Sequence, residues 1–67
     1  MFIVIEIQMT DKVATLVTAH EDRNEAEAKY HAILAAAAKS KMAVHSCVML
    51  TESGYFIKSE KYEHKEV

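Results

Sequence analysis

Residues 22–40 read DRNEAEAKYHAILAAAAKS, and this stretch decides the fold. Asp22 lies three residues before Glu25, which is the spacing of a capping box at the start of a helix. The acidic side chain of Glu25 suits the positive first turn, and the basic side chain of Lys39 suits the negative last turn. The pattern predicts one helix from about residue 23 to residue 39.

The two sides of this helix differ in composition. The side expected to pack on the core carries larger apolar residues at helical spacing, namely Ala26, Tyr30, Ile33, Leu34 and Ala37. The reverse side carries alanine where a solvated helix usually shows Lys, Glu and Gln, at Ala28, Ala32, Ala35 and Ala36. Alanine is the best helix former and tolerates water, but a smooth alanine surface also lets a second helix approach closely. Both interpretations remain open from the sequence.

Two β-prone runs precede the helix. Residues 2–9 alternate with period two in strongly β-prone residues, which predicts a strand. Residues 10–12 supply turn chemistry, and the run 13–19 is again β-branched and alternating. The two runs are expected to close as a hairpin.

A second hairpin is expected after the helix. Residues 42–50 are β-rich, residues 51–54 form a turn with the only glycine of the chain, and a fourth strand begins at Tyr55. Its charged continuation, residues 58–67, suits a solvated edge strand. With the turn centred on residues 52–53, His45 is predicted to lie opposite Glu60 and Met49 opposite Phe56.

The alternation in this second hairpin predicts which side faces the core. The residues expected to point toward the core are Val44, Val48, Leu50, Tyr55 and Ile57. The parity assigned to the outer sheet face is Ala43, His45, Cys47, Met49, Phe56, Lys58, Glu60 and Tyr62, joined by Val4, Glu6 and Gln8 of the first strand. An outer face that is half apolar and half ionisable suits a sheet-face dimer or the floor of a ligand site.

The chain is therefore expected to be a single α+β domain over residues 1–67. It would have two layers, a four-stranded sheet and one alanine-rich helix, in the order β-β-α-β-β. At 67 residues and 51% hydrophobic composition it is too apolar for its own small interior, so we expect a homo-oligomer, a dimer or larger.

Charge and composition exclude several partners. The net charge of -2 comes from interspersed acids and bases, so nonspecific nucleic-acid binding is disfavoured. The opening apolar run is interrupted at Glu6 and is too short for a membrane span, so no membrane contact is expected. The single Cys47 cannot form an internal disulfide and suits a buried thiol in the cytoplasm.

Motifs with defined chemistry are absent from the sequence. The four histidines, at positions 20, 31, 45 and 64, show no metal-ligand spacing, so no metal and no cofactor are expected. Ser46 beside His45 is not a nucleophile pair, because neighbours on a strand point to opposite faces. Ser40 or Tyr30 could meet His45 in space. A phosphate would fit Lys39 and Lys41 with Ser40, or Lys58 and Lys61 of the last strand.

The pattern EAEAKYHAILAAAAKS, then HSCVML, then a short turn with Gly54 and a charged last strand resembles a group of small uncharacterised proteins from Firmicutes and their prophages. The resemblance implies that Tyr30-His31, the alanine run, Ser40 and His45-Ser46 belong to a shared pattern and are candidates for a site. Short phage-borne α+β proteins of this kind often resemble anti-defence factors, which sequester nucleotide signals or block an enzyme by docking on it.

Three functional hypotheses follow. The first is an oligomeric ligand-binding protein that holds a small polar or nucleotide-type ligand at a subunit interface, with Tyr30 or Tyr62 stacking on a base and Lys39 or Lys41 meeting phosphate. Its ligand-binding candidates are Tyr30, His31, Ser40, Lys41, His45 and Tyr62. The second is a protein-interaction module or inhibitor that docks through its sheet face or edge strand. The third is a small oligomeric enzyme with His31 or His45 as general base.

Overall fold

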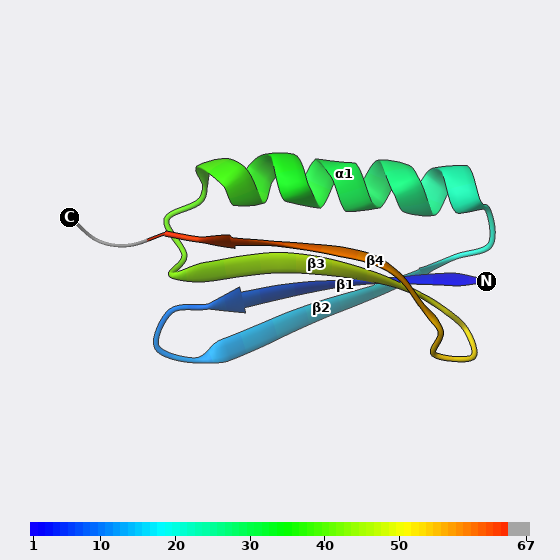
Figure 1. Ribbon diagram of the computed structural model, residues 1–67, viewed down its shortest axis with the longest axis horizontal. Coiled ribbons are helices and arrows are strands. Elements are labelled where there is room, and N and C mark those ends of the chain that lie inside the picture. Colours follow the sequence, from blue (N-terminus) through cyan, green and yellow to red (C-terminus); the bar gives the residue numbers. More distant parts are fainter. Residues whose placement is uncertain (65–67) are drawn as a thin grey trace.

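The computed structural model describes residues 1–64 and shows one helix lying along one side of a four-stranded sheet (Figure 1). The α+β architecture and the order β-β-α-β-β are as the sequence predicts. The elements are β1 (Phe2–Met9), β2 (Val13–His20), α1 (Arg23–Lys39), β3 (Val44–Thr51) and β4 (Phe56–Glu63).

The strands lie in the order β2-β1-β3-β4, and every neighbouring pair is antiparallel. Each hairpin pairs strands that are adjacent in sequence, and α1 carries the chain back so that β3 lies beside β1. The two hairpins therefore meet at the centre of the sheet, while β2 and β4 are its edges. Strand order was not available from the sequence.

The ends of the helix agree with the sequence prediction. The side chain of Asp22 accepts a hydrogen bond from the backbone N–H of Asn24 at 3.1 Å, and Ser40 is the C-cap, whose N–H donates to the carbonyl of Ala37. Glu25 lies in the first turn and Lys39 in the last, where each charge opposes the helix dipole.

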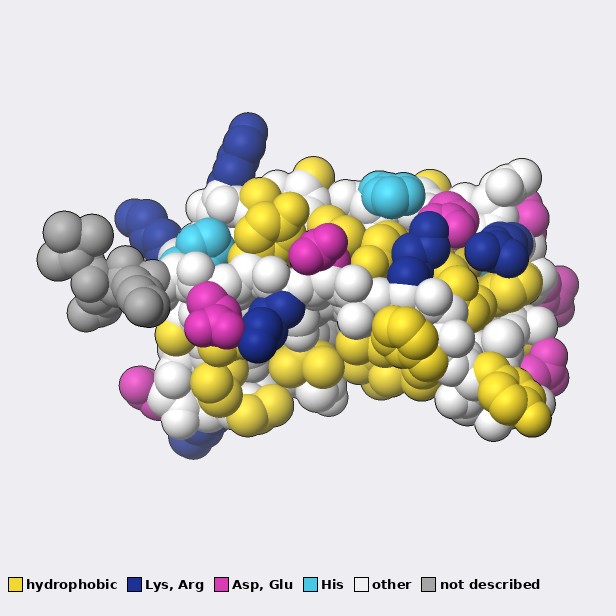
Figure 2. All heavy atoms as spheres, in the orientation of Figure 1, with side chains coloured by type: hydrophobic (Ala, Val, Ile, Leu, Met, Phe, Trp, Pro, Cys, Tyr) yellow, Lys and Arg dark blue, Asp and Glu magenta, His cyan; other side chains and the backbone are white. Residues whose placement is uncertain are grey.

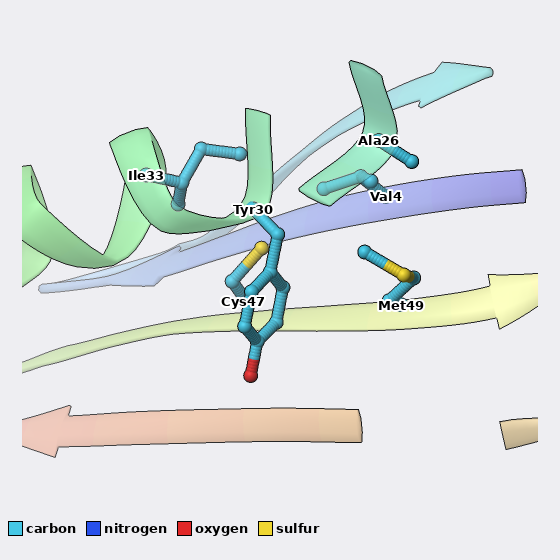
Figure 3. Packing of buried hydrophobic residues seen from close by; sticks show 6 residues of the cluster. All are labelled: Val4, Ala26, Tyr30, Ile33, Cys47 and Met49. Atoms are coloured by element: carbon cyan, nitrogen blue, oxygen red, sulfur yellow. The ribbon is translucent and has the colours of Figure 1, made fainter. Parts of the chain in front are cut away.

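The core lies between α1 and the two central strands. Val4 of β1 and Cys47 and Met49 of β3 are fully buried under Ala26 and Tyr30 of the helix. Figure 3 shows the ring of Tyr30 extending from the helix past Cys47 toward β4. The predicted core side of the helix is confirmed, since its buried residues are Ala26, Tyr30, Ile33 and Ala37, with Leu34 packed beside them.

The predicted sides of the sheet are wrong. His45, Cys47 and Met49 were assigned to the outer face, but they lie buried against the helix with Val4, and the strand register adds Glu6, Gln8, Lys58, Glu60 and Tyr62 to the same side. Most of the predicted group does share one side of the sheet, but that side faces the helix. Phe56 is the exception, because it pairs with Leu50 and lies on the face without the helix. Both parities are rich in apolar residues, so alternation alone could not choose the side that the helix covers.

The residues predicted as core, Val44, Val48 and Leu50, instead belong to the sheet face that carries no helix. Ile57 is the exception, because it packs against the core, whereas Tyr55 precedes β4 and is exposed.

The predicted register of the second hairpin is also wrong. His45 lies opposite Tyr62, not Glu60, and Met49 lies opposite Lys58, not Phe56. A register shift between Met49 and Leu50 inserts an extra residue in β4. Such a bulge leaves no signal in the alternation pattern. The strand ends differ from prediction by one or two residues, and the last three residues of the predicted charged tail, 65–67, lie outside the described residues.

Candidate functional site

A chain of buried and partly buried polar side chains connects the C-terminal end of the helix with β3 and β1. Nε2 of His45 lies 2.7 Å from Oε2 of Glu6, and Nδ1 of His45 lies 3.0 Å from Oγ of Ser40. The amide nitrogen of Gln8 also donates to Oε2 of Glu6, at 3.0 Å. His45 is only 4% exposed, and the carboxylate of Glu6 is mostly buried. We call Ser40, His45, Glu6 and Gln8 the polar relay.

The direction of each hydrogen bond follows from the chemistry of the groups. An ionised carboxylate can only accept, so Nε2 of His45 carries the proton that it donates to Glu6. In the neutral imidazole Nδ1 is then an acceptor, and it receives the hydroxyl proton of Ser40. The oxygen of Ser40 in turn accepts from the backbone N–H of Met42 at 3.4 Å. Every member of the polar relay therefore has a partner.

Electrostatics favour the ionised form of Glu6. Burial alone raises the pKa of its carboxyl group, but the hydrogen bonds from His45 and Gln8 outweigh burial, and the positive charge of Lys29 adds to them. The net result is a pKa below the ordinary value of 4.5. Glu6 therefore carries a negative charge on the side of the sheet that faces the helix.

Cys47 is not a nucleophile in this setting. Burial raises the pKa of its thiol to about 11, and the nearby charge of Glu6 acts in the same direction. The thiol stays protonated and packs as a small apolar group, as the sequence predicts.

The polar relay resembles a Ser-His-Glu triad in its order of hydroxyl, imidazole and carboxylate. However, Ser40 caps the C-terminal end of α1, where the last helix carbonyls concentrate negative charge. An oxyanion forming at Ser40 would be repelled there, whereas acyl transfer needs positive donors around it. The arrangement thus ties the helix end to β3 and β1 and does not favour the enzyme hypothesis.

An open hollow of about 170 Å³ lies at one end of the polar relay. Its polar lining comes from Glu6 and Gln8 of β1. Its remaining wall comes from Ala14, Thr15 and Leu16 of β2, and Leu16 is 55% exposed. The helix packs mainly on β1 and β3, so this part of β2 has no cover. We call this feature the Glu6 hollow.

A second hollow, of about 260 Å³, lies beyond the C-terminal end of the helix and is lined by Thr10, Asp11, Lys41, Ala43 and His64. Nε2 of His64 donates to the carbonyl of Ala37 at 2.8 Å, and the ring of Tyr62 lies parallel to the His64 ring. Lys41 offers a positive charge here, but Asp11 offsets it. We call this feature the Lys41 hollow.

The structure brings some of the predicted site residues together. Ser40 and His45 are in direct contact, Tyr62 lies opposite His45 in the sheet, and Lys41 follows Ser40 at the helix end. Tyr30 is buried in the core instead, with its phenol pKa raised mainly by burial. His31 lies exposed on the helix, 3.5 Å from Glu27.

The alternative phosphate site on the last strand is weakened by the structure. Lys58 is paired with Glu27 of the helix, and Lys61 is paired with Glu63 at 2.9 Å. Both ammonium groups therefore already have carboxylate partners.

The ligand-binding residues predicted from the sequence do not include Leu16 and His64, and they include Glu6 and Gln8 only as part of the sheet face that suits the floor of a ligand site. A signal existed for Glu6 and Gln8, because they interrupt an apolar strand on the parity that pairs with His45. Leu16 and His64 gave no such signal, since their roles depend on which strand the helix leaves uncovered.

The sheet face opposite the helix is apolar and has no covering layer among residues 1–64. Strand register places on this face the large apolar residues Ile3, Ile5, Ile7, Met9, Val13, Val17, Val44, Val48, Leu50 and Phe56, together with Thr15, Ala19, Ser46, Ser59, Lys61 and Glu63. Val17 is 58% exposed and Phe56 is 64% exposed. In Figure 2 hydrophobic atoms are prominent along the strand side of the molecule, away from the helix. We call this surface the open face.

Comparison of the chain with models of known families, with curated proteins and with solved structures gives no significant match. Within residues 1–64 no group of three or more His, Cys, Asp or Glu side chains is arranged to hold a metal ion. Over the same residues, no helix combines the length and apolar character needed to cross a bilayer.

Replacing His45 by Leu should lower the free energy of unfolding by about 2–3 kcal/mol, because it removes a charge-assisted hydrogen bond from a mostly buried carboxylate. Urea denaturation measures this. The matched control is His31→Leu, which removes an exposed histidine beside a carboxylate and should change stability by less than about 0.5 kcal/mol. Equal effects of the two changes would show that the polar relay does not stabilise the fold.

The lowered pKa of Glu6 also predicts how stability depends on pH. A carboxyl group whose pKa is lower in the folded protein than in the unfolded chain adds stability at neutral pH, and this contribution is lost as the pH falls from 4.5 through the lowered pKa. Glu6→Gln should therefore reduce the free energy of unfolding at pH 7. It should also make the free energy of unfolding fall less steeply as the pH is lowered below 4.5, as urea unfolding at several pH values would measure. Glu63→Gln, at an exposed ion pair, is the control and should change this pH dependence of stability less.

Proposed function

We propose that this protein is a small homo-oligomeric ligand-binding protein whose subunits associate through the open face. The observation that carries the proposal is the open face itself, an apolar sheet surface with no covering layer among the described residues. Soluble monomers rarely expose a contiguous apolar surface of this kind. The polar relay and the two hollows lie on the helix side or at the end of the sheet, so they stay accessible in such an assembly.

The area of the open face suits a second copy of the chain. Four strands about 4.8 Å apart, each of eight residues rising about 3.3 Å, give a flat area of about 500 Å² before side-chain relief is added. A stable complex buries about 800 Å² per partner. Two open faces packed sheet on sheet at a spacing of about 10 Å reach that range.

The charge of the open face also favours a second copy. Among residues 1–64 its charged side chains are Lys61 and Glu63, which pair with each other near one end of β4. A neutral apolar surface can face its own image across a two-fold axis without repulsion. This composition is typical of permanent homodimer interfaces, whereas transient partners usually meet through more polar surfaces.

The ligand is proposed to be small and polar, with nucleotides as the first class to test. Support comes from the polar groups gathered near the helix end, where Lys41 lies in a hollow beside the parallel rings of Tyr62 and His64. A role as a phage anti-defence factor is a narrower proposal, and its support is the sequence resemblance alone. Docking of the open face on a different protein is the alternative outcome of the oligomer test.

Val17→Lys should convert the dimer to a monomer, because it places a charge on the apolar open face, halfway along edge strand β2. Light scattering after size-exclusion chromatography should give twice the chain mass for the natural protein and the chain mass for the variant. Leu16→Lys is the matched control, because Leu16 directly precedes Val17 on the same strand and is similarly exposed but lies on the helix side. This variant should stay dimeric. A natural protein that is monomeric at micromolar concentration would refute the proposed assembly.

A nucleotide panel tests the ligand class separately. A thermal-shift assay with mono-, di- and cyclic nucleotides should show stabilisation by at least one member, because a ligand that binds only the folded state raises the melting temperature. Lys41→Ala should weaken that stabilisation if the ligand is anionic, with Lys12→Ala in the β1–β2 turn as a control. The absence of stabilisation by every member would exclude nucleotides while leaving the oligomer result intact.

A further inference from the structure

We propose that the Glu6 hollow binds a flat aromatic group whose edge carries nitrogen hydrogen-bond donors, the chemistry shared by aryl amidines and by the N–H edges of nucleobases. The inference rests on the ligand-binding part of the proposed function and adds a location and a chemical class. Five residues line the hollow, and the argument depends on Glu6, Gln8 and Leu16.

The polar groups available in the hollow are acceptors. Oε2 of Glu6 receives both relay hydrogen bonds, from His45 and from Gln8. Oε1 of Glu6 takes part in neither. Because no fully buried side-chain oxygen or nitrogen among the described residues lacks a partner, Oε1 is not fully buried. Gln8 uses its amide nitrogen on Glu6, which leaves its carbonyl oxygen as the second acceptor. Two neighbouring acceptors select a ligand that supplies donors.

The carboxylate is held in place before a ligand arrives. Two hydrogen bonds fix its orientation, and His45 behind it is in turn held by Ser40 at the helix end. A group that is already positioned and ionised loses little conformational freedom on binding, so more of the interaction energy appears as affinity. This explains how a single charged group in a shallow hollow can be selective.

The remaining wall of the hollow is apolar and uncovered. Leu16 and Ala14 lie on the side of β2 that faces the helix layer, but the helix packs over β1 and β3. A flat ring placed on Leu16 would cover this surface while its edge reaches the two acceptors. Pockets for drug-sized ligands begin at about 300 Å³, so a hollow of about 170 Å³ suits one ring system with the rest of the ligand in solvent.

The test uses benzamidinium and benzoate as probes, because they have the same shape and opposite charge. In ¹H–¹⁵N spectra of the full chain, benzamidinium chloride should shift the amide signals of Glu6, Gln8, Ala14 and Leu16 with saturation in the millimolar range, and sodium benzoate should not. Equal shifts with the two probes, or no saturable shift with benzamidinium, would overturn the proposal.

Leu16→Trp tests the location of the site, because the larger side chain fills the hollow while Glu6, Gln8 and the other groups of the polar relay are left unchanged. It should weaken benzamidinium binding at least about tenfold, which corresponds to 1.4 kcal/mol. Ala28→Trp, on the exposed side of the helix, is the control and should bind normally. Unchanged binding by the Leu16 variant would refute the location.

Failure of this proposal is distinguishable from failure of the proposed function. The titration reports on a hollow formed by one chain, so it can be repeated with the Val17→Lys variant whatever the oligomeric state. A natural protein that is monomeric at micromolar concentration but gives saturable benzamidinium shifts would reject the assembly alone. If a nucleotide stabilises the dimer but shifts none of the amide signals of the Glu6 hollow, only the proposed location of the site is rejected.

Discussion

One helix is too narrow to cover four strands, and most features of this molecule depend on that constraint. A helix with its side chains is about 10–12 Å wide, whereas four strands about 4.8 Å apart span nearly twice that distance. The helix lies over β1 and β3, where the fully buried residues of the sheet are found. On the helix side it leaves β2 uncovered at residues 14–16, where the Glu6 hollow lies. It also leaves the opposite face of the whole sheet without cover.

The polar relay offsets a cost of this arrangement. Glu6 and His45 lie on the same side of the sheet as the core, where an unpaired charge would be strongly destabilising. Their mutual hydrogen bond, the amide of Gln8 and the hydroxyl of Ser40 give these two side chains their partners, and no buried side-chain nitrogen or oxygen among the described residues is left without one. The same contacts connect the helix C-cap to the two central strands. An ionised carboxylate can therefore lie beside a small core without disrupting it.

The two uncovered surfaces differ in character, and this separates their proposed roles. The open face is broad, apolar and nearly without charge, as expected for contact with a second copy of the chain. The Glu6 hollow is small and combines an ionised carboxylate with an apolar wall, as expected for contact with a small molecule. Because they lie on opposite sides of the same strands, one can be occupied without blocking the other.

The sequence by itself determined the local structure. The Asp22 cap, the first-turn Glu25 and the helical spacing of Ala26, Tyr30 and Ile33 depend on neighbours within a few residues, and each is found as predicted. The four strands and their order in the chain follow from local alternation for the same reason. The grouping of Glu6 and Gln8 with His45 on one side of the sheet was also available, because the period of a strand is fixed at two.

Only the tertiary structure decided which side of the sheet the helix covers. Both parities of β3 are apolar enough to be core, so hydrophobicity could not separate Val48 and Leu50 from Cys47 and Met49. The choice is made by long-range packing of Tyr30 and by the contact of His45 with Glu6, which is 39 residues away in the chain. The bulge beside Leu50 and the exposure of Leu16 likewise depend on contacts between segments that are far apart in the sequence. The physical reason is that local pattern fixes the form of each element, whereas the pairing of elements depends on which buried surfaces fit together.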